Sequence, residues 1–465
     1  MKKIIILSTL ICYLLLNGSC SSSFLDKEPP LYVNENDIFT SPTRIESALN
    51  GLYGAIKNTS DKSFLGGKTY LAFENRGDDV VNISNNLVTL FNTYNMNVGP
   101  TDAENADTWT SAYLAINKVN TFLESLEKAK DVAGENYNRY VQEAKFIRAL
   151  TYYYLNNLYA IPYSVNPEAK SVPLRLTAEK GTNNNNMPRS SVKKVYEQIL
   201  EDLKDISALS VSSNTYASVT HATQAAANML KLRVYMSMKD WSKAIAAGEL
   251  ITGYELPSDV TIIYKSPYFS RESIFSLPMA DTNVPNTQQS LAEYYFDGKI
   301  MLIDTKKGIM SKANYSVAAD KRIAAFKGTG GILMKFTDAK TKLQWVPIFR
   351  YAETLLNLAE CYANQPNGET TAKALLKQVR GRSIAAANDP LNVDALSGNA
   401  LKEAIYNEKR LELIGEGIRS IDIMRRGETF LKVSDNETIE VTPSNEKYTW
   451  PIPQVETLIN GDINK

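Results

Sequence analysis

Few residues in this chain carry the side chains that enzymes use for nucleophilic or metal chemistry. His221 is the only histidine, so a Ser-His-Asp or Cys-His triad, or a histidine-based zinc site, would depend on this one residue. The sequence contains no Gly-x-Ser-x-Gly motif, and residues 66–69 resemble the end of a phosphate-binding loop but have Lys62 where its first glycine belongs. We therefore expect no cofactor and no metal site. A carboxylate pair could still hydrolyse a glycan, yet no spacing among the 51 acidic residues singles out such a pair.

Acidic and basic residues alternate with apolar ones between residues 405 and 427. Charges three or four residues apart on a helix can pair along its side or with a neighbouring helix, and Arg350 and Glu353 have the same i, i+3 spacing. Arginine suits such pairs because its planar group can bind both oxygens of a carboxylate. We interpret these charges as ion pairs that fix helix packing, rather than as catalytic groups. The charged positions are Glu408, Arg410, Glu412, Glu416, Arg419 and Asp422.

The N-terminus has the pattern of an export signal. Lys2 and Lys3 precede an apolar run from residue 4 to residue 16, which is shorter than the roughly 20 residues of a membrane-spanning helix. Cys20 directly follows Gly-Ser, which resembles a bacterial lipobox, although Asn17 stands where lipoboxes usually have Leu. We expect residues 1–19 to be a signal peptide, Cys20 to be lipidated, and residues 20–30 to form a polar tether. The alternative is an ordinary secretory signal in which Cys20 has no role.

The composition is that of a folded protein without a strong charge. Hydrophobic residues make up 44% of the 465, and Lys plus Arg and Asp plus Glu both number 51. A chain without a basic field is a poor partner for a phosphate backbone, so nucleic acid is not an expected partner. Once Cys12 leaves with the signal and Cys20 is acylated, Cys361 is the one cysteine left in the folded body, and its apolar surroundings predict a buried side chain.

Apolar residues recur every three or four positions through most of the chain, which predicts paired helices. His221 should lie in the first turn of an alanine-rich helix. Residues 131–138 are expected to be a loop, and residues 252–345, which lose this period, should form a long loop-rich region. We predict a mainly α fold of tetratricopeptide-like helical hairpins, with an N-terminal part at 31–251 and a C-terminal part at 252–465. The expected helices span residues 109–126, 140–158, 192–206, 222–236, 241–251, 346–363, 370–383 and 401–426.

Six segments, in order along almost the whole mature chain, have recognisable motifs. They are 24–26 (Phe-Leu-Asp), 143–153 (Glu-Ala-x-x-x-Arg-Ala), 346–360 (Pro-x-x-Arg-Tyr-Ala-Glu), 379–382 (Val-Arg-Gly-Arg), 405–427 and 450–454 (Trp-Pro-Ile-Pro-Gln). In these segments the chain resembles the SusD/RagB family. The tail departs from the family pattern, because residues 460–465 read Asn-Gly-Asp-Ile-Asn-Lys where relatives usually end near Asn-Pro. This departure affects only how firmly the last residues are expected to dock.

The resemblance implies a SusD-like fold and a non-enzymatic lipoprotein on the outer membrane of a Bacteroidota-type bacterium. Such proteins bind oligosaccharides and deliver them to a TonB-dependent transporter of the SusC/RagA type. A peptide-binding lid of the RagB kind is the main alternative. A surface hydrolase and a scaffolding helical-repeat lipoprotein are the remaining ones.

Sugar-binding relatives stack sugar rings on aromatic side chains, which offer a large apolar area at low entropic cost. Trp109 and Trp241 look like helix core, and Trp450 lies in the closing motif. We predict a ligand platform drawn from residues 76–95 and 264–345, although each aromatic ring could instead pack beneath its own loop. The predicted ligand-binding residues are Arg76, Asp78, Asp79, Phe91, Tyr94, Asn95, Tyr294, Tyr295, Tyr315 and Trp345.

Overall fold

The computed structural model describes residues 38–60, 62, 64–181, 185–211, 215–433 and 438–465. The predicted signal peptide, the lipidation site at Cys20 and the tether therefore lie outside the described residues. Within them the chain is mainly helical, with three two-stranded sheets, which confirms the predicted fold class. None of the helices in the described part is long and apolar enough to span a membrane.

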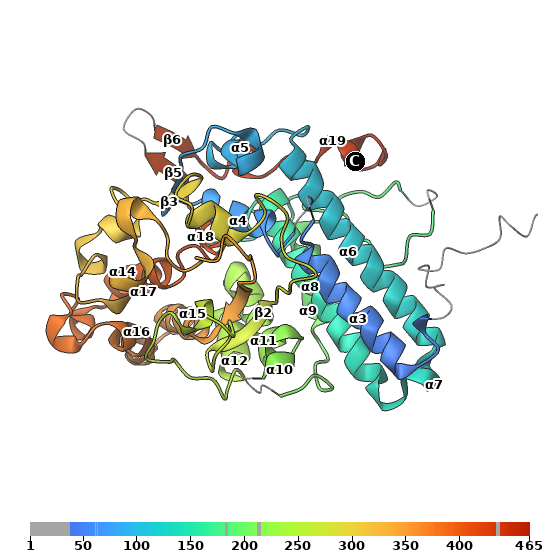
Figure 1. Ribbon diagram of the computed structural model, residues 1–465, viewed down its shortest axis with the longest axis horizontal. Coiled ribbons are helices and arrows are strands. Elements are labelled where there is room, and N and C mark those ends of the chain that lie inside the picture. The colour runs from blue at the N-terminus through green and yellow to red at the C-terminus, as the bar shows by residue number, and fades with distance from the viewer. Residues whose placement is uncertain (1–37, 61, 63, 182–184, 212–214, 434–437) are drawn as a thin grey trace, which may run out of the picture.

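Long helices that pack side by side form the N-terminal part (Figure 1). In α3 (Pro42–Lys57), Ser41 caps the first turn and a stripe of Ile45, Leu49, Leu52 and Ile56 is buried, as the spacing of one helix face requires. This stripe packs against α6 (Ala103–Lys128) and α8 (Tyr137–Tyr159), and α8 packs in turn against α9 (Val192–Asp202). The expected loop at 131–138 is mostly helical, because α7 (Lys130–Ala133) and η3 (Gly134–Asn136) fill it.

The next hairpin joins the two parts of the molecule. It consists of α11 (Gln224–Met238) and α12 (Trp241–Glu249), and α12 also packs on α15 (Tyr351–Ala363). Gly248 permits this close approach, since a Cβ there would come within 2.6 Å of Leu358 Cδ2. His221 lies outside the alanine-rich helix, after the short α10 (Tyr216–Thr220) and before Thr223, which caps α11. Its expected place in the first helical turn is therefore wrong.

A strand interrupts the predicted helix at 346–363. β4 (Val346–Arg350) pairs antiparallel with β2 (Ser273–Leu277), and α15 begins only at Tyr351. All five residues of β4 are buried, and a short apolar run buried on both faces has no period that separates strand from helix. β2 lies within the expected loop-rich region at 252–345.

The helix predicted at 401–426 is also two helices. α17 (Gly398–Glu412) and α18 (Arg419–Arg426) are separated by a turn in which Gly415 and Gly417 have φ angles of 81° and 63°. α16 (Glu369–Ser383) packs against α15 and α17 and agrees with its predicted range. These helices lie on the side of the molecule opposite α3 and α6 (Figure 1).

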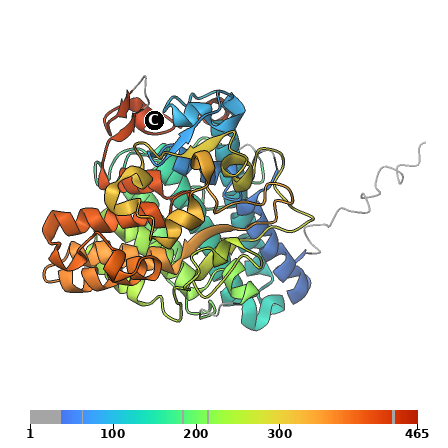
Figure 2. The same ribbon diagram turned by 60° about the vertical axis from the view of Figure 1, so that its left-hand side comes forward.

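The remaining elements are short, and the red C-terminal strands lie at the top of the molecule in both views (Figure 2). β1 (Val80–Asn82) pairs with β3 (Met301–Ile303), and β5 (Phe430–Val433) pairs with β6 (Thr438–Val441). The other α-helices are α4 (Lys68–Asn75), α5 (Phe91–Tyr94), α13 (Leu291–Tyr295), α14 (Lys321–Phe326) and α19 (Gln454–Thr457). The 3-10 turns are η2 (Leu87–Thr89), η4 (Ile262–Tyr264), η5 (Ile309–Ser311), η6 (Ala313–Tyr315), η7 (Thr329–Gly331), η8 (Ala386–Asn388), η9 (Val393–Ala395) and η10 (Glu446–Tyr448).

A group of buried charges ties the loop-rich region to α16, α17 and the turn before α18; we call it the buried ion network. At its centre, Arg350 contacts Glu412 Oε1 at 2.7 Å and Glu416 Oε2 at 2.7 Å. The predicted structural role of the 405–427 charges is confirmed, because all six are buried and paired. Arg350 and Glu353 do not pair with each other. Glu353 binds Arg233 of α11 at 2.6 Å, so of the two expected kinds of pairing it is the one between neighbouring helices that occurs. The network comprises Glu272, Asp320, Arg322, Lys335, Arg350, Arg380, Arg382, Asp389, Glu408, Glu412 and Glu416.

Candidate functional site

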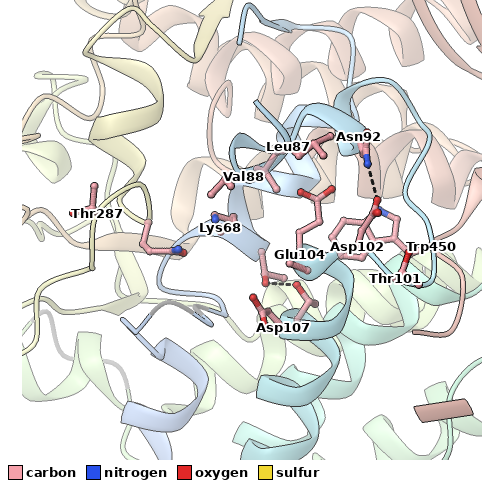
Figure 3. A pocket seen from close by; sticks show the side chains of 15 residues that line it. Lys68, Leu87, Val88, Asn92, Thr101, Asp102, Glu104, Asp107, Thr287 and Trp450 are labelled. Carbon is pink, nitrogen blue, oxygen red and sulfur yellow. Dashed lines mark hydrogen bonds between the residues drawn. The ribbon is translucent and has the colours of Figure 1, made fainter. Parts of the chain in front are cut away.

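A cavity of about 460 Å³ lies where α6 begins. Its walls come from the start of α4, the 87–92 segment, the first turns of α6, residues 287–289 and Trp450 (Figure 3). The cavity is therefore built from segments far apart in the chain. Asn105, one turn into α6, holds the C-terminal segment in place by donating to the carbonyl of Pro451 at 3.0 Å.

Hydrogen bonds fix the 87–95 segment against the start of α6. Asp102 Oδ2 accepts from Asn92 Nδ2 at 2.8 Å (Figure 3) and from the Gly99 amide at 2.9 Å. Thr93 Oγ1 donates to Glu104 Oε1 at 2.7 Å. Leu90, fully buried, has a φ of 63° between η2 and α5. A left-handed backbone is unusual for a bulky side chain and marks a conformation held by its surroundings.

The cavity combines titratable groups with an apolar rim. Burial raises the pKa of Glu104 to about 7, and the nearby Asp102 adds to the shift while Thr93 and Lys68 oppose it. At neutral pH this carboxyl is therefore partly protonated and can donate as well as accept a hydrogen bond. Leu87 and Val88 at the rim are 62% and 55% exposed. Such a lining can bond polar ligand groups and cover apolar ones.

The predicted residues Arg76, Asp78 and Asp79 make internal contacts instead of lying open. The guanidinium of Arg76 donates to the carbonyl of Tyr448 at 2.6 Å. Arg410 lies 2.7 Å from Asp79 Oδ1, and Arg419 lies 2.5 Å from Asp78 Oδ1. Burial alone would raise the pKa of Asp78, but Arg419 and Arg410 lower it to about 2. These contacts hold α4 against α17 and α18, and a ligand-binding role for the three residues stays a prediction.

The aromatic residues predicted in the loop-rich region are buried as well. Tyr294 and Tyr295 have no exposed surface, and Tyr315 donates to the carbonyl of Ala404 at 3.2 Å. Trp345 is 7% exposed and packs among other aromatic rings. In this structure these rings are used in internal packing, and Trp345 contacts Tyr216 of α10 as well as Phe269. The structure does not join them into one exposed platform.

Two of the predicted ligand-binding residues, Asp78 and Tyr94, reach a cavity. Phe91, Tyr94 and Asn95 are half-buried, and Tyr94 and Asp78 line a smaller cavity of about 90 Å³ together with Lys307 and Lys432. Lys432 Nζ lies 3.8 Å from the centre of the Tyr94 ring. Burial lowers the pKa of Lys432 well below its usual value. The structure thus brings Asp78 and Tyr94 together, but across a narrow space.

The sequence does not indicate the residues of the larger cavity. Asn92, Asp102 and Glu104 belong to it, yet in the sequence they read as a polar segment before a helix. Trp450 lies in the closing motif, which by itself indicates no ligand site. The one feature that could have indicated a site is the group of acidic residues at the start of α6. Acidic residues are common at a helix N-terminus for electrostatic reasons, so this feature does not identify a ligand site. Among the described residues, no group of three His, Cys, Asp or Glu side chains is placed to hold a metal ion.

Together, the fold and the cavity define a helical-hairpin protein that carries a loop-built ligand cavity at one end of its long helices. A family model described as "Starch-binding associating with outer membrane" matches residues 23–236, and the SusD family model matches residues 291–465. A crystal structure of a SusD superfamily protein from Bacteroides fragilis is 80% identical, covers 92% of this chain and all of its own, and superposes with a TM-score of 0.92. The chain belongs to the SusD family.

More distant relatives agree with this assignment. The SusD-like protein P25 of Formosa agariphila is 23% identical, over 98% of this chain and 97% of its own length. A SusD superfamily protein from Bacteroides thetaiotaomicron is 20% identical, covers 91% of this chain and 99% of its own, and has a TM-score of 0.79. The latter similarity supports the fold alone.

Proposed function

We propose that this protein is a non-enzymatic, cell-surface lipoprotein that binds oligosaccharides and delivers them to a TonB-dependent outer-membrane transporter of the SusC type. The observation that carries the proposal is membership of the SusD family, one of whose models is described as starch-binding and associated with the outer membrane. Anchoring through lipidated Cys20 and exposure at the cell surface are parts of the same proposal.

The cavity at the start of α6 is the ligand site that we propose. Its size of about 460 Å³ is in the range of small-ligand sites. Asn92, Asp102 and Glu104 supply amide and carboxyl groups that can bond sugar hydroxyls, and Leu87 and Val88 can cover the apolar face of a ring. Hydrogen bonds and apolar contacts in this cavity would be enough to bind an oligosaccharide and release it again.

A peptide-binding lid is the second candidate, and the lining of the cavity favours it in two respects. The aromatic residue in the lining is Trp450, which is 4% exposed, whereas Leu87 and Val88 are more than half exposed. Aliphatic side chains suit a peptide side chain better than the flat face of a sugar. Asp102, Glu104 and Asp107 outnumber Lys68 in the lining, which would favour a ligand that carries an amino group.

Calorimetry on the mature chain tests both candidates. We would titrate maltohexaose, xylohexaose, cellohexaose and a mixture of tri- to pentapeptides, and analyse each mixture for cleavage by chromatography. The double substitution Leu87→Ala with Val88→Ala should weaken binding of the preferred ligand about tenfold without lowering the melting temperature, because both side chains are exposed. Leu250→Ala, on a side chain that is 66% exposed and lies outside the cavity lining, is the matched control.

Three outcomes would contradict the proposal or redirect it. Binding of peptides but no glycan would favour the second candidate. Equal binding by the wild type and the Leu87→Ala, Val88→Ala variant would remove the ligand site from the cavity. Release of shortened glycans would contradict a non-enzymatic role.

A further inference from the structure

Four aromatic side chains from three distant segments meet at the surface near the start of β4; we call them the aromatic cluster. They are Tyr216 at the start of α10, Tyr268 and Phe269 in the loop before β2, and Trp345 just before β4. Tyr216 is 58% exposed, Tyr268 and Phe269 are half-buried, and Trp345 is 7% exposed. The cluster therefore presents exposed ring surface around a nearly buried indole.

The rings are arranged around Trp345. Phe269 stacks on the indole with an interplanar angle of 16° and a centroid distance of 5.7 Å. Tyr216 meets it edge to face at 5.4 Å and 79°, and Tyr268 lies at 6.5 Å. Trp345 thus holds its neighbours in fixed orientations, so that little side-chain entropy would be lost when a ligand packs on them.

Three polar atoms of this cluster have no partner in the part of the chain that the structure describes. Within the described residues, neither the hydroxyls of Tyr216 and Tyr268 nor the indole N–H of Trp345 has a hydrogen-bond partner. At two buried positions elsewhere such groups are bonded: Trp109 Nε1 donates to Glu456 at 3.1 Å, and the Tyr264 hydroxyl donates to Glu416 at 2.7 Å. Tyr216 is mostly exposed and Tyr268 is half-buried, so their hydroxyls are available to a ligand. Three unused polar groups on an aromatic surface suit a ligand that is rich in hydroxyls.

The backbone at the cluster is strained. Tyr268 has a φ of 66°, in the left-handed region, and its amide donates to the carbonyl of Lys265 at 2.6 Å. An aromatic side chain seldom adopts this conformation, and where it persists the surroundings hold it. Here the conformation places the Tyr268 ring beside Trp345.

The cluster is separate from the cavity at the start of α6. α10, which carries Tyr216, lies at the lower edge of the molecule in Figure 1, whereas α5 and the start of α6 lie at the upper edge. Figure 2 is turned about the vertical axis, so this separation in height is the same in both views. No cluster residue lines the larger cavity.

We propose that the aromatic cluster is a second carbohydrate-binding site, in which a pyranose ring stacks on the exposed rings of Tyr216 and Phe269. The hydroxyls of Tyr216 and Tyr268 and the N–H of Trp345 bond the hydroxyls of the sugar. The inference rests on the proposed function only for the chemical class of the ligand. Two sites on one chain can hold one long glycan at two points. When the contact at one site breaks, the other site still holds the glycan, so its dissociation is slower.

Fluorine NMR on the chain labelled with 5-fluorotryptophan can observe both sites at once. The chain contains four tryptophans, of which Trp345 reports on the cluster, Trp450 on the cavity, and Trp109, buried and bonded to Glu456, serves as an internal control. Trp345→Phe and Trp450→Phe assign the signals. We expect at least one of maltohexaose, xylohexaose, cellohexaose and galactotetraose to shift the Trp345 signal and leave that of Trp109 in place.

Substitutions then test the stacking contact. Tyr216→Ala should raise the Kd read from the Trp345 signal by roughly three- to tenfold, the range expected for one lost aromatic contact, with an unchanged melting temperature because the side chain is mostly exposed. The matched control is Tyr235→Ala. Tyr235 lies on α11, is half-buried and packs beside Lys243 of α12, so its removal should leave this Kd unchanged.

Each further outcome decides the proposal. No shift of Trp345 with any of the four glycans, or a Kd insensitive to Tyr216→Ala, would overturn it. A shift of Trp345 with the peptide mixture alone would overturn it in favour of a peptide site. If Trp450 responds to a glycan and Trp345 does not, this inference fails and the proposed function stands. If only Trp345 responds, the second site stands and the cavity loses its assigned role.

Discussion

At the scale of single residues, burial determines what the charged side chains of this protein can do. Glu412 is 1% exposed, and its carboxylate lies 2.7 Å from Arg350, 3.0 Å from Arg322 and 2.5 Å from Arg382. Burying one charge without partners would be prohibitive, whereas these contacts stabilise the ionised form. The local i, i+3 spacing of Arg350 and Glu353 could not indicate that arrangement, because the true partners of Arg350 lie about 60 to 80 residues away.

Glu412→Gln should therefore lower the free energy of unfolding by about 3–5 kcal/mol at pH 7, because it leaves arginines without their charge partner. Burial would raise the pKa of Glu412, but Arg382, Arg350 and Arg322 hold it well below 4.5. A depressed pKa gives stabilisation that is complete above about pH 4.5 and is lost as the pH falls. Urea unfolding between pH 3 and 8 should thus show the difference between the two proteins shrinking below pH 4.5.

The matched control for this residue is Glu403→Gln. Glu403 pairs with Arg426 at 2.7 Å, but its side chain is 56% exposed. Exposed pairs contribute about 0–1 kcal/mol, so the control should be close to the wild type. A Glu412→Gln protein that unfolds like this control would contradict a stabilising role for the buried ion network.

At the scale of secondary-structure elements, the turn between α17 and α18 places the network's charges. Gly417 has a φ of 63°, and a Cβ there would come within 2.9 Å of the carbonyl oxygen of Tyr70 in α4. Gly415 has a φ of 81°, and its amide donates to Glu74 Oε1 at 3.0 Å. The turn thus depends on both glycine geometry and a close approach to α4.

Gly417→Ala should destabilise the protein by about 1–3 kcal/mol, the cost of a left-handed backbone for a residue with a Cβ. Gly51→Ala in α3 is the control, because its Cβ would meet no atom within 4 Å and alanine favours a helix by up to about 1 kcal/mol. Thermal unfolding followed by circular dichroism measures both. Equal melting temperatures for the two variants would show that the turn tolerates a side chain.

The sequence predicted the long helices well, because their apolar stripes are local features. It missed the break at Gly415 and Gly417, since the reason for the break is contact with α4, more than 300 residues earlier. It took β4 as the start of α15 because a short buried strand has no helical or strand period of its own. The cavity could not be predicted for a similar reason: its lining residues come from α4, the start of α6, residues 287–289 and Trp450.

At the scale of the whole molecule, the predicted parts at 31–251 and 252–465 share their buried polar contacts. Asp79 pairs with Arg410 at 2.7 Å, and Arg233 pairs with Glu353 at 2.6 Å. Trp109 Nε1 donates to Glu456 at 3.1 Å. Each of these side chains is buried, so either part alone would hold charges and donors without partners. The parts before and after residue 252 are therefore not expected to fold independently of each other.

Because the two parts share these buried contacts, we expect a fragment of residues 31–251 to be unstable. Asp79 and Arg233 would each lose a buried partner in a chain of residues 31–251, at a cost of about 3–5 kcal/mol apiece, against a typical total stability of about 5–15 kcal/mol. We expect this fragment to show no cooperative thermal transition, whereas residues 31–251 and 252–465 produced as two chains in one cell should assemble and melt together. Near-ultraviolet circular dichroism and calorimetry measure both samples. A cooperative transition in the isolated fragment would show that the contacts across residue 252 join two finished domains instead of completing one.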